Sequence, residues 1–118
     1  MPDERQPTTL RRPAANASGA RHEMPAIDEA GLEAGRRADR VIAAARAAQA
    51  DRWVAYFEPL ADRLRDDEPR ALRQAALRGR AAYGPKDSVR DALPSEVTEP
   101  LLEALDRVLK VLNRRDVA

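Results

Sequence analysis

Apolar residues along most of the chain recur every three or four positions, which is the spacing of one face of an α-helix. The clearest case is near the C-terminus, where Thr98 is expected to cap a helix and Pro100 to lie in its first turn. Strand-forming residues are sparse and never alternate over a useful length. The pattern predicts an all-α protein, whose last helix has an apolar face made of Leu101, Leu102, Leu105, Val108, Leu109 and Leu112.

A second apolar stripe predicts a long first helix. It starts near Asp28, which can cap it, and runs to about Glu58. Proline lacks an amide hydrogen and crowds the preceding turn, so we expect a kink or restart at Pro59 and a continuation to about Arg65. Most of the middle of the stripe is alanine, which lets another helix approach closely but buries little area. Its members are Ala38, Ile42, Ala45, Gln49, Trp53, Tyr56, Leu60 and Leu64.

Two further helices are expected between these. One spans about 68–83, because acidic residues followed by Pro69 favour a helix start and Gly84-Pro85 favours an end. Ser88, with Asp91 three positions later, resembles a capping box and predicts a short helix that stops before Pro94. Together, the elements predict a bundle of three to four helices with a long first helix.

Residues 1–26 have a different character. Four prolines interrupt this stretch, and Asn16-Ala17-Ser18-Gly19 adds small polar residues. Such a segment buries too little apolar surface to offset its ordering entropy. We therefore expect a disordered tail over 1–26 and one helical domain over 27–118. The alternative is an arm that folds onto a partner through Arg11, Arg12 and Arg21.

Composition narrows the class of protein. The chain has 118 residues, with 21 basic against 20 acidic, so it is not globally basic. It has no cysteine, which excludes disulfides and thiol chemistry. No segment approaches the roughly 18 apolar residues of a membrane span, and the first ten residues do not form a secretory signal. We expect a cytoplasmic protein, and its bias toward alanine and arginine is typical of high-GC bacterial genomes.

The sequence carries no pattern that favours catalysis. The single histidine, His22, lies in the expected tail, and Ser88, Ser95 and Thr98 are better explained as helix caps and turn residues. Asp62, Asp66, Asp67 and Glu68 cluster at a helix start, where carboxylates usually stay solvated and favour the helix dipole. We therefore expect a non-enzymatic protein with no cofactor, metal or small-molecule substrate.

The long first helix suggests a protein partner. A helix of 30 residues spans about 45 Å, and the later helices are too short to cover its N-terminal half. A second copy, or a helix of another protein, would cover the alanine stripe. Trp53 and Tyr56 are expected to pack against Tyr83 and the last helix; alternatively, Trp53 or Phe57 anchors a partner. The predicted partner interface is Ala38, Ile42, Ala45, Gln49, Trp53 and Phe57.

A local run of basic residues supports a second interpretation. No acidic residue occurs between Pro69 and Asp87. Arg70, Arg73 and Arg80 are expected on the outer face of the third helix, with Leu77 and Ala81 nearby. Arginines of this kind contact phosphates and base edges. A helix-turn-helix motif is rejected, because the helix that follows is too short. The candidate contacts are Arg70, Arg73, Arg78, Arg80 and Lys86.

We therefore expect a protein–protein interaction module, namely a homodimer, an adaptor or a regulatory subunit. A structural subunit of a larger particle fits the same pattern. The alternative is a small nucleic-acid-associated regulator, such as a transcription factor or an antitoxin, that uses the arginine patch.

Overall fold

The computed structural model describes residues 24–66 and 68–117, with side chains as far as Arg114. Its helices are α1 (Pro25–Ala47), α2 (Asp51–Arg63), α3 (Pro69–Ala81), the single-turn α4 (Val89–Ala92) and α5 (Ser95–Val117). These ranges contain no strand, so the all-α prediction is confirmed. Most of the expected tail, 1–23, lies outside the described residues, as does His22. Pro25 and Ala26 already belong to α1.

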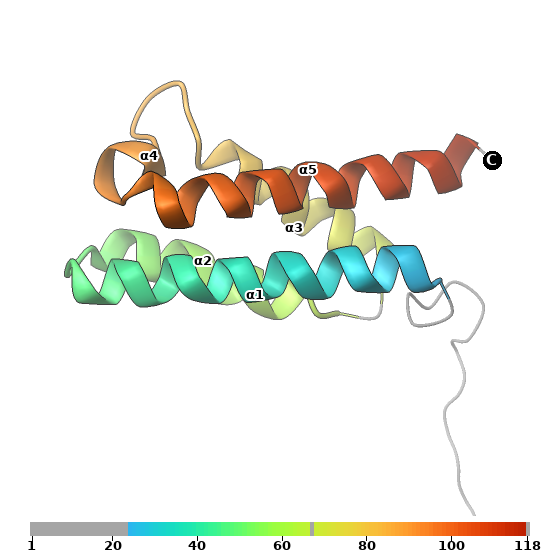
Figure 1. The fold of residues 1–118 in the computed structure, drawn as a ribbon, viewed down its shortest axis with the longest axis horizontal. Coiled ribbons are helices and arrows are strands. Elements are labelled where there is room, and N and C mark those ends of the chain that lie inside the picture. The colour runs from blue at the N-terminus through green and yellow to red at the C-terminus, as the bar shows by residue number, and fades with distance from the viewer. Residues whose placement is uncertain (1–23, 67, 118) are drawn as a thin grey trace, which may run out of the picture.

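Four of the helices form an up-and-down bundle. Each of α1, α2, α3 and α5 runs antiparallel to the one before it, and α4 lies at the end of the bundle, in the connection between α3 and α5 (Figure 1). Around the bundle, α1 packs on α2, α2 on α3, α3 on α5 and α5 on α1. The longest elements, α1 and α5, have 23 residues each and lie side by side. The predicted helical bundle is therefore confirmed.

The single helix predicted over 28–58 is wrong, because the chain turns back at Ala48–Ala50. Gln49 adopts the left-handed region, with φ of 57°. Its amide donates to the carbonyl of Arg46 at 3.1 Å, and the amide of Ala50 donates to the carbonyl of Ala45 at 2.8 Å. This pairing is a Schellman-type helix end, in which the left-handed residue is usually glycine. Because this position is glutamine, the sequence does not indicate that a helix ends here.

Pro59 does not restart a helix, so this part of the second expectation is wrong, whereas the expected continuation of the helix toward Arg65 is confirmed. It lies inside α2, which is continuous from Asp51 to Arg63. Proline at this position removes the hydrogen bond to the carbonyl of Ala55. Both Ala55 and Pro59 are exposed, so water reaches that side of the helix. The freed carbonyl lies on an exposed side of the helix, where water can satisfy it, and the helix continues.

Because the chain folds back at Gln49, it covers its own alanine stripe. Four alanines and one valine on α1 are at most 1% exposed, enclosed by α2 and α5. The expectation that this stripe needs an outside mate is therefore wrong. Alanine suits the position because its small side chain lets neighbouring helices approach closely. The five are Ala30, Ala34, Ala38, Val41 and Ala45.

Larger side chains fill the rest of the core from α2, α3 and α5. One contact depends on a glycine: a Cβ added to Gly79 on α3 would lie 2.7 Å from Cδ1 of Leu105 on α5. The missing side chain therefore makes room for a leucine that is 1% exposed. The largest fully buried apolar side chains in this part of the core are Phe57, Leu64, Leu72, Leu101, Leu105 and Val108.

In the second half of the chain, the helices mostly start and end where the sequence predicts. Gly84 has φ of 138° after the end of α3, and the Ser88 hydroxyl accepts a hydrogen bond from the amide of Arg90 at 3.0 Å. The start of α5 differs, because the helix begins at Ser95 rather than at Thr98. Thr98 is therefore a fully buried residue inside the helix and not its cap. Pro100 lies inside α5 rather than in its first turn.

Glycine in place of Gln49 should stabilise the protein. The left-handed conformation is strained for a residue with a Cβ, whereas glycine adopts it freely. Allowing for the greater backbone entropy of glycine in the unfolded chain, we expect a gain of about 0.5–1 kcal/mol in the free energy of unfolding. Urea denaturation measures it. A loss of stability would show that the α1–α2 turn does not have this backbone conformation.

Candidate interaction surfaces

Most residues of the predicted partner interface lie in the core of the chain itself. Ala38, Ile42, Ala45, Trp53 and Phe57 are 0–6% exposed. Gln49 is exposed, because it occupies the turn between α1 and α2. The hairpin explains this outcome, since the two halves of the expected long helix pack against each other. These residues hold the bundle together and are not accessible to a partner in this fold.

The three aromatic residues of α2 form one cluster. The ring of Tyr56 meets those of Trp53 and Phe57 with centroids 5.5 Å and 5.2 Å apart. Tyr56 is half-buried, and its hydroxyl donates to the backbone carbonyl of Arg78 on α3 at 2.6 Å. The guanidinium of Arg78 lies 4.7 Å from the centroid of the same ring, a cation–π geometry. The cluster therefore joins α2 to α3 and holds Arg78 in place.

The outward side of α3 is the most distinctive exposed surface. The helix buries Leu72, Ala75, Ala76 and Gly79 against the bundle. With 3.6 residues per turn, the residues opposite them point to solvent. Among these is Leu77, which is 52% exposed. The line of exposed residues on this side is Arg70, Gln74, Leu77 and Ala81.

Three more arginines flank this line. Toward α5, Nη1 of Arg73 donates to Oδ1 of Asn113 at 2.9 Å, and Nε of Arg80 lies 2.7 Å from Oδ1 of Asp106. Toward α2, Arg78 stacks on Tyr56. We define the α3 face as the exposed line together with these flanking arginines: Arg70, Arg73, Gln74, Leu77, Arg78, Arg80 and Ala81.

The structure therefore brings together four of the five residues predicted to contact nucleic acid. Lys86 lies in the connection after Gly84, beyond the end of α3. Arg70 makes no ion pair or hydrogen bond with the described residues. Arg80 is paired with a carboxylate on α5. The patch is thus partly compensated by neighbouring helices, and the sequence alone could not show this pairing.

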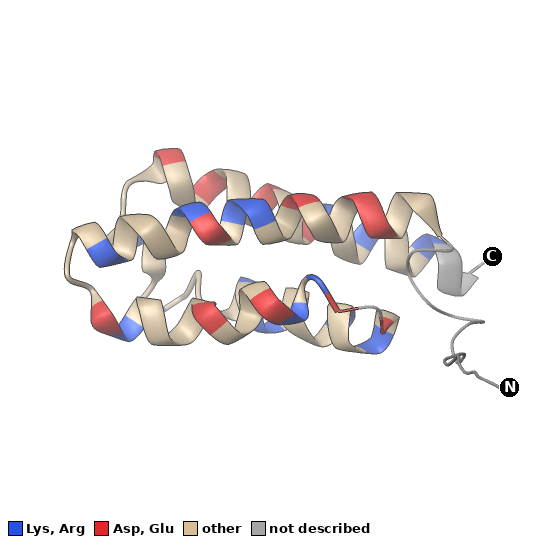
Figure 2. Cartoon of the chain, turned by 90° about the horizontal axis from the view of Figure 1, so that it is seen from below, with Lys and Arg blue, Asp and Glu red and all other residues tan. Residues whose placement is uncertain are grey.

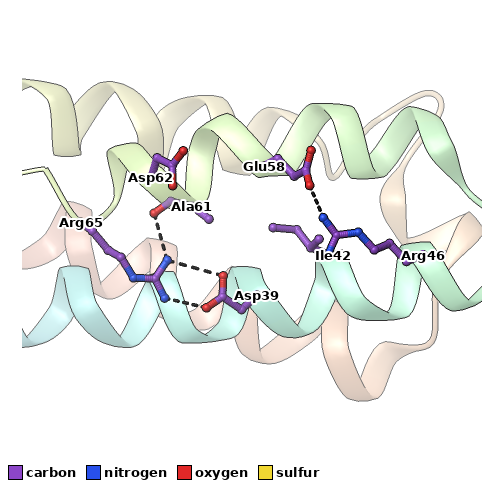
Figure 3. Close-up of a pocket in the computed structure, with 7 residues that line it drawn as sticks. All are labelled: Asp39, Ile42, Arg46, Glu58, Ala61, Asp62 and Arg65. Carbon is purple, nitrogen blue, oxygen red and sulfur yellow. Dashed lines mark hydrogen bonds and ion pairs between the residues drawn. The ribbon is translucent and has the colours of Figure 1, made fainter.

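A groove on another side of the bundle separates α1 from α2 (Figure 3). It has a volume of about 430 Å³. Arg65 and Asp39 pair across it at 2.7 Å, and Arg46 pairs with Glu58 two turns along. Exposed pairs of this kind contribute only about 0–1 kcal/mol each. The lining residues are Asp39, Ile42, Arg46, Glu58, Ala61, Asp62 and Arg65.

The charged side chains that line this groove pair with one another and so connect α1 to α2, rather than forming an open charged site. The guanidinium of Arg65 also donates to the carbonyl of Ala61 at 3.2 Å, and it packs so closely on Gly35 that a Cβ added there would lie 3.0 Å from its Cζ. Its cations are therefore engaged with groups of the groove itself. Figure 2 shows basic and acidic positions interspersed along α1 and α2. In contrast, α3 carries four arginines and no acidic residue.

The connection from α3 to α5 is held by a polar cluster around Tyr83. The hydroxyl of Tyr83 donates to the carbonyl of Thr98, and Arg90 lies 5.4 Å from the ring centroid. Nε and Nη2 of Arg90 bond the two carboxylate oxygens of Glu99, each at 2.8 Å. Burial, and secondarily the charge of Glu99, raises the pKa of Tyr83 above its ordinary range. Hydrogen bonds from Arg90 lower the pKa of Glu99.

The raised pKa of Tyr83 predicts a loss of stability at high pH. The unfolded chain ionises at a lower pH than the folded one, so the contribution of Tyr83 is complete below about pH 10 and is lost above it. Denaturation at about pH 9 and about pH 11 should show a steeper loss for the wild type than for Tyr83→Phe. Equal slopes would mean that the phenol is not buried against α5.

Within the described ranges, no group of three His, Cys, Asp or Glu side chains is placed to hold a metal ion. None of the helices in that part of the chain is long and apolar enough to cross a membrane. Comparisons with protein-family models, curated proteins and solved structures found no match. The function of these surfaces must therefore be argued from their own residues.

Proposed function

We propose that the chain is a non-enzymatic protein–protein interaction module, an adaptor or regulatory subunit, that binds another protein through the α3 face. The observation that carries the proposal is the exposure of Leu77 amid arginines. An apolar centre within a polar rim is the usual anatomy of a binding patch, and arginine is enriched among the residues that dominate binding energy.

The setting of the arginines supports binding as well. Arg78 is held over the Tyr56 ring, and Arg80 is held by Asp106. A guanidinium has five N–H donors, so a single contact leaves others for a second acceptor. Side chains already fixed in place lose less entropy when a partner arrives. The α3 face is therefore prepared for binding rather than merely charged.

Two alternatives are weaker. A homodimer was expected in order to cover the alanine stripe of α1, but that stripe is already buried within the chain. A nucleic-acid contact would use the same arginines, yet Arg80 is paired with a carboxylate and Leu77 offers nothing to a phosphate. A different protein, with both apolar and polar contacts, fits the surface better.

The test is affinity purification from a lysate of the source organism, with three tagged baits. Besides the wild type, Leu77→Ser removes the centre of the α3 face. Leu32→Ser is the matched control, because Leu32 is the other large apolar side chain exposed in the described residues, at 38%, and lies on α1. We expect proteins that the wild type and Leu32→Ser retain and Leu77→Ser loses. Equal retention by all three baits would contradict the proposal.

A further inference from the structure

We infer that the occupant of the α3 face is an acidic amphipathic helix of a partner protein, with an apolar residue against Leu77 and carboxylates on the arginines. This inference rests on the proposed function and specifies the partner's chemistry. It follows from the charge of the face, the spacing of its residues and the surfaces that the chain can offer to itself.

The α3 face is positively charged because its own helix carries no compensating acid. Four arginines occur in 13 residues of α3. Among these, Arg80 forms an ion pair with Asp106, and Arg73 donates a hydrogen bond to Asn113. Arg70 and Arg78 are not paired with any carboxylate in the described part of the chain. The remaining positive potential attracts carboxylates and repels basic surfaces.

The spacing of the face fits a helix. Arg70, Gln74, Leu77 and Ala81 follow one another at steps of four, three and four, so they form a line along the helix axis. The line covers about 16 Å, or about three turns. A partner helix lying along it would present residues at the same steps, with an apolar seam and polar flanks.

The flanks determine which polar residues the partner carries. Arg73 and Arg80 border the line on the α5 side, and Arg78 borders it on the α2 side. Guanidinium groups bind carboxylates through paired, charge-assisted hydrogen bonds. A helix with Glu or Asp on both sides of its apolar seam would therefore meet an arginine on either flank.

A second copy of the chain does not offer this complement. The other exposed leucine, Leu32, has Glu33 beside it. The carboxylate of Glu33 is held at 2.7 Å by both Arg36 and Arg37. The charge of Glu33 is therefore already met within the chain, and Arg36 and Arg37 are basic groups that the α3 face would repel.

The experiment uses the full chain and fluorescence anisotropy with labelled synthetic helical peptides of about four turns. One peptide has leucine along one face and glutamate on both flanks; its control has glutamine in place of every glutamate. We expect the glutamate peptide to bind about tenfold more tightly at low salt, with the difference shrinking as salt is added. Leu77→Ser should weaken the binding of both peptides.

Charge-matched variants separate the α3 face from general attraction. Arg70→Gln and Arg40→Gln change the net charge equally, but Arg40 lies exposed on α1. Arg70→Gln should lower the affinity for the glutamate peptide several-fold, whereas Arg40→Gln should leave that affinity unchanged. Equal losses of affinity in the two variants, or equal binding of the two peptides, would contradict the inference that the partner helix is acidic. A Leu77-dependent capture from lysate would then still support the proposed function.

Nucleic acid is tested in the same format. A labelled 20-base-pair DNA duplex should bind weakly and without dependence on Leu77. Tight duplex binding with a steep salt slope, lost in Arg70→Gln and kept in Leu77→Ser, would overturn both the acidic partner and the proposed function.

Discussion

Leucine in place of Ala38 is expected to lower the free energy of unfolding by about 1–3 kcal/mol. Ala38 is fully buried on α1, in a face where alanine sets the distance to the neighbouring helices. Three extra carbon atoms at that position have no room and force the helices or side chains to move. Alanine and leucine have similar helix propensities, so the change reports packing rather than local helicity. Chemical denaturation measures the difference.

The matched control is Ala43→Leu, on the exposed side of the same helix. It should change stability by less than about 0.5 kcal/mol. The pair of variants distinguishes two descriptions of α1. If the alanine stripe were open and awaiting a mate, leucine at Ala38 would be neutral or stabilising; that result would contradict a stripe covered by its own chain.

Truncating Leu105 to alanine should cost about 2–5 kcal/mol. Leu105 is 1% exposed and lies between α5 and α3, against Gly79. Its loss removes apolar contacts and leaves a cavity that the surrounding helices fill only in part. Because small domains have only about 5–15 kcal/mol of stability, this single change would remove a large share of it. Urea denaturation, followed by helical circular dichroism, checks the value.

A double-mutant cycle with Gly79→Ala identifies the contact responsible. In the wild type, a Cβ on Gly79 would lie 2.7 Å from Cδ1 of Leu105, so the leucine must shift. In the Leu105→Ala background that methyl group meets empty space, and alanine also favours the helix. Gly79→Ala should therefore be less costly, or stabilising, in the second background. Additive effects would show that the two residues do not touch.

The sequence predicts the second half of the chain well because each element there carries its own end signals. Pro69 marks the start of α3, Gly84-Pro85 follows its end, and Ser88 caps α4. The start of α5 was placed one turn late. The helix already begins at Ser95, and Thr98 is fully buried inside it, which depends on tertiary packing rather than on local capping signals.

The first half of the chain is predicted less well, because the residue at which α1 ends does not stand out from its neighbours in the sequence. Gln49 sits in an alanine-rich stretch and adopts a conformation usually left to glycine. Periodicity continues across the turn, so one helix and two packed helices look alike in sequence. Because one long helix was predicted, residues such as Ile42 and Trp53 were assigned to a partner interface, whereas they pack within the chain.

The α3 face was partly predictable. Helical periodicity predicts Arg70, Arg73 and Arg80 on the outer side of α3, and the structure exposes Arg70 and Arg80 while Arg73 is partly buried. The groups that meet these arginines could not be foreseen, because Asp106 and Tyr56 come from helices distant in the sequence. The sequence thus locates the surface, while the fold distinguishes the compensated arginines from the uncompensated ones.

The fold requires that a single chain enclose the small, apolar side of α1 by itself. Sedimentation equilibrium of the purified protein at micromolar concentration tests this directly. We predict a helical species with the mass of one chain, 13.0 kDa. A stable dimer that loses its helicity when diluted into monomers would contradict it.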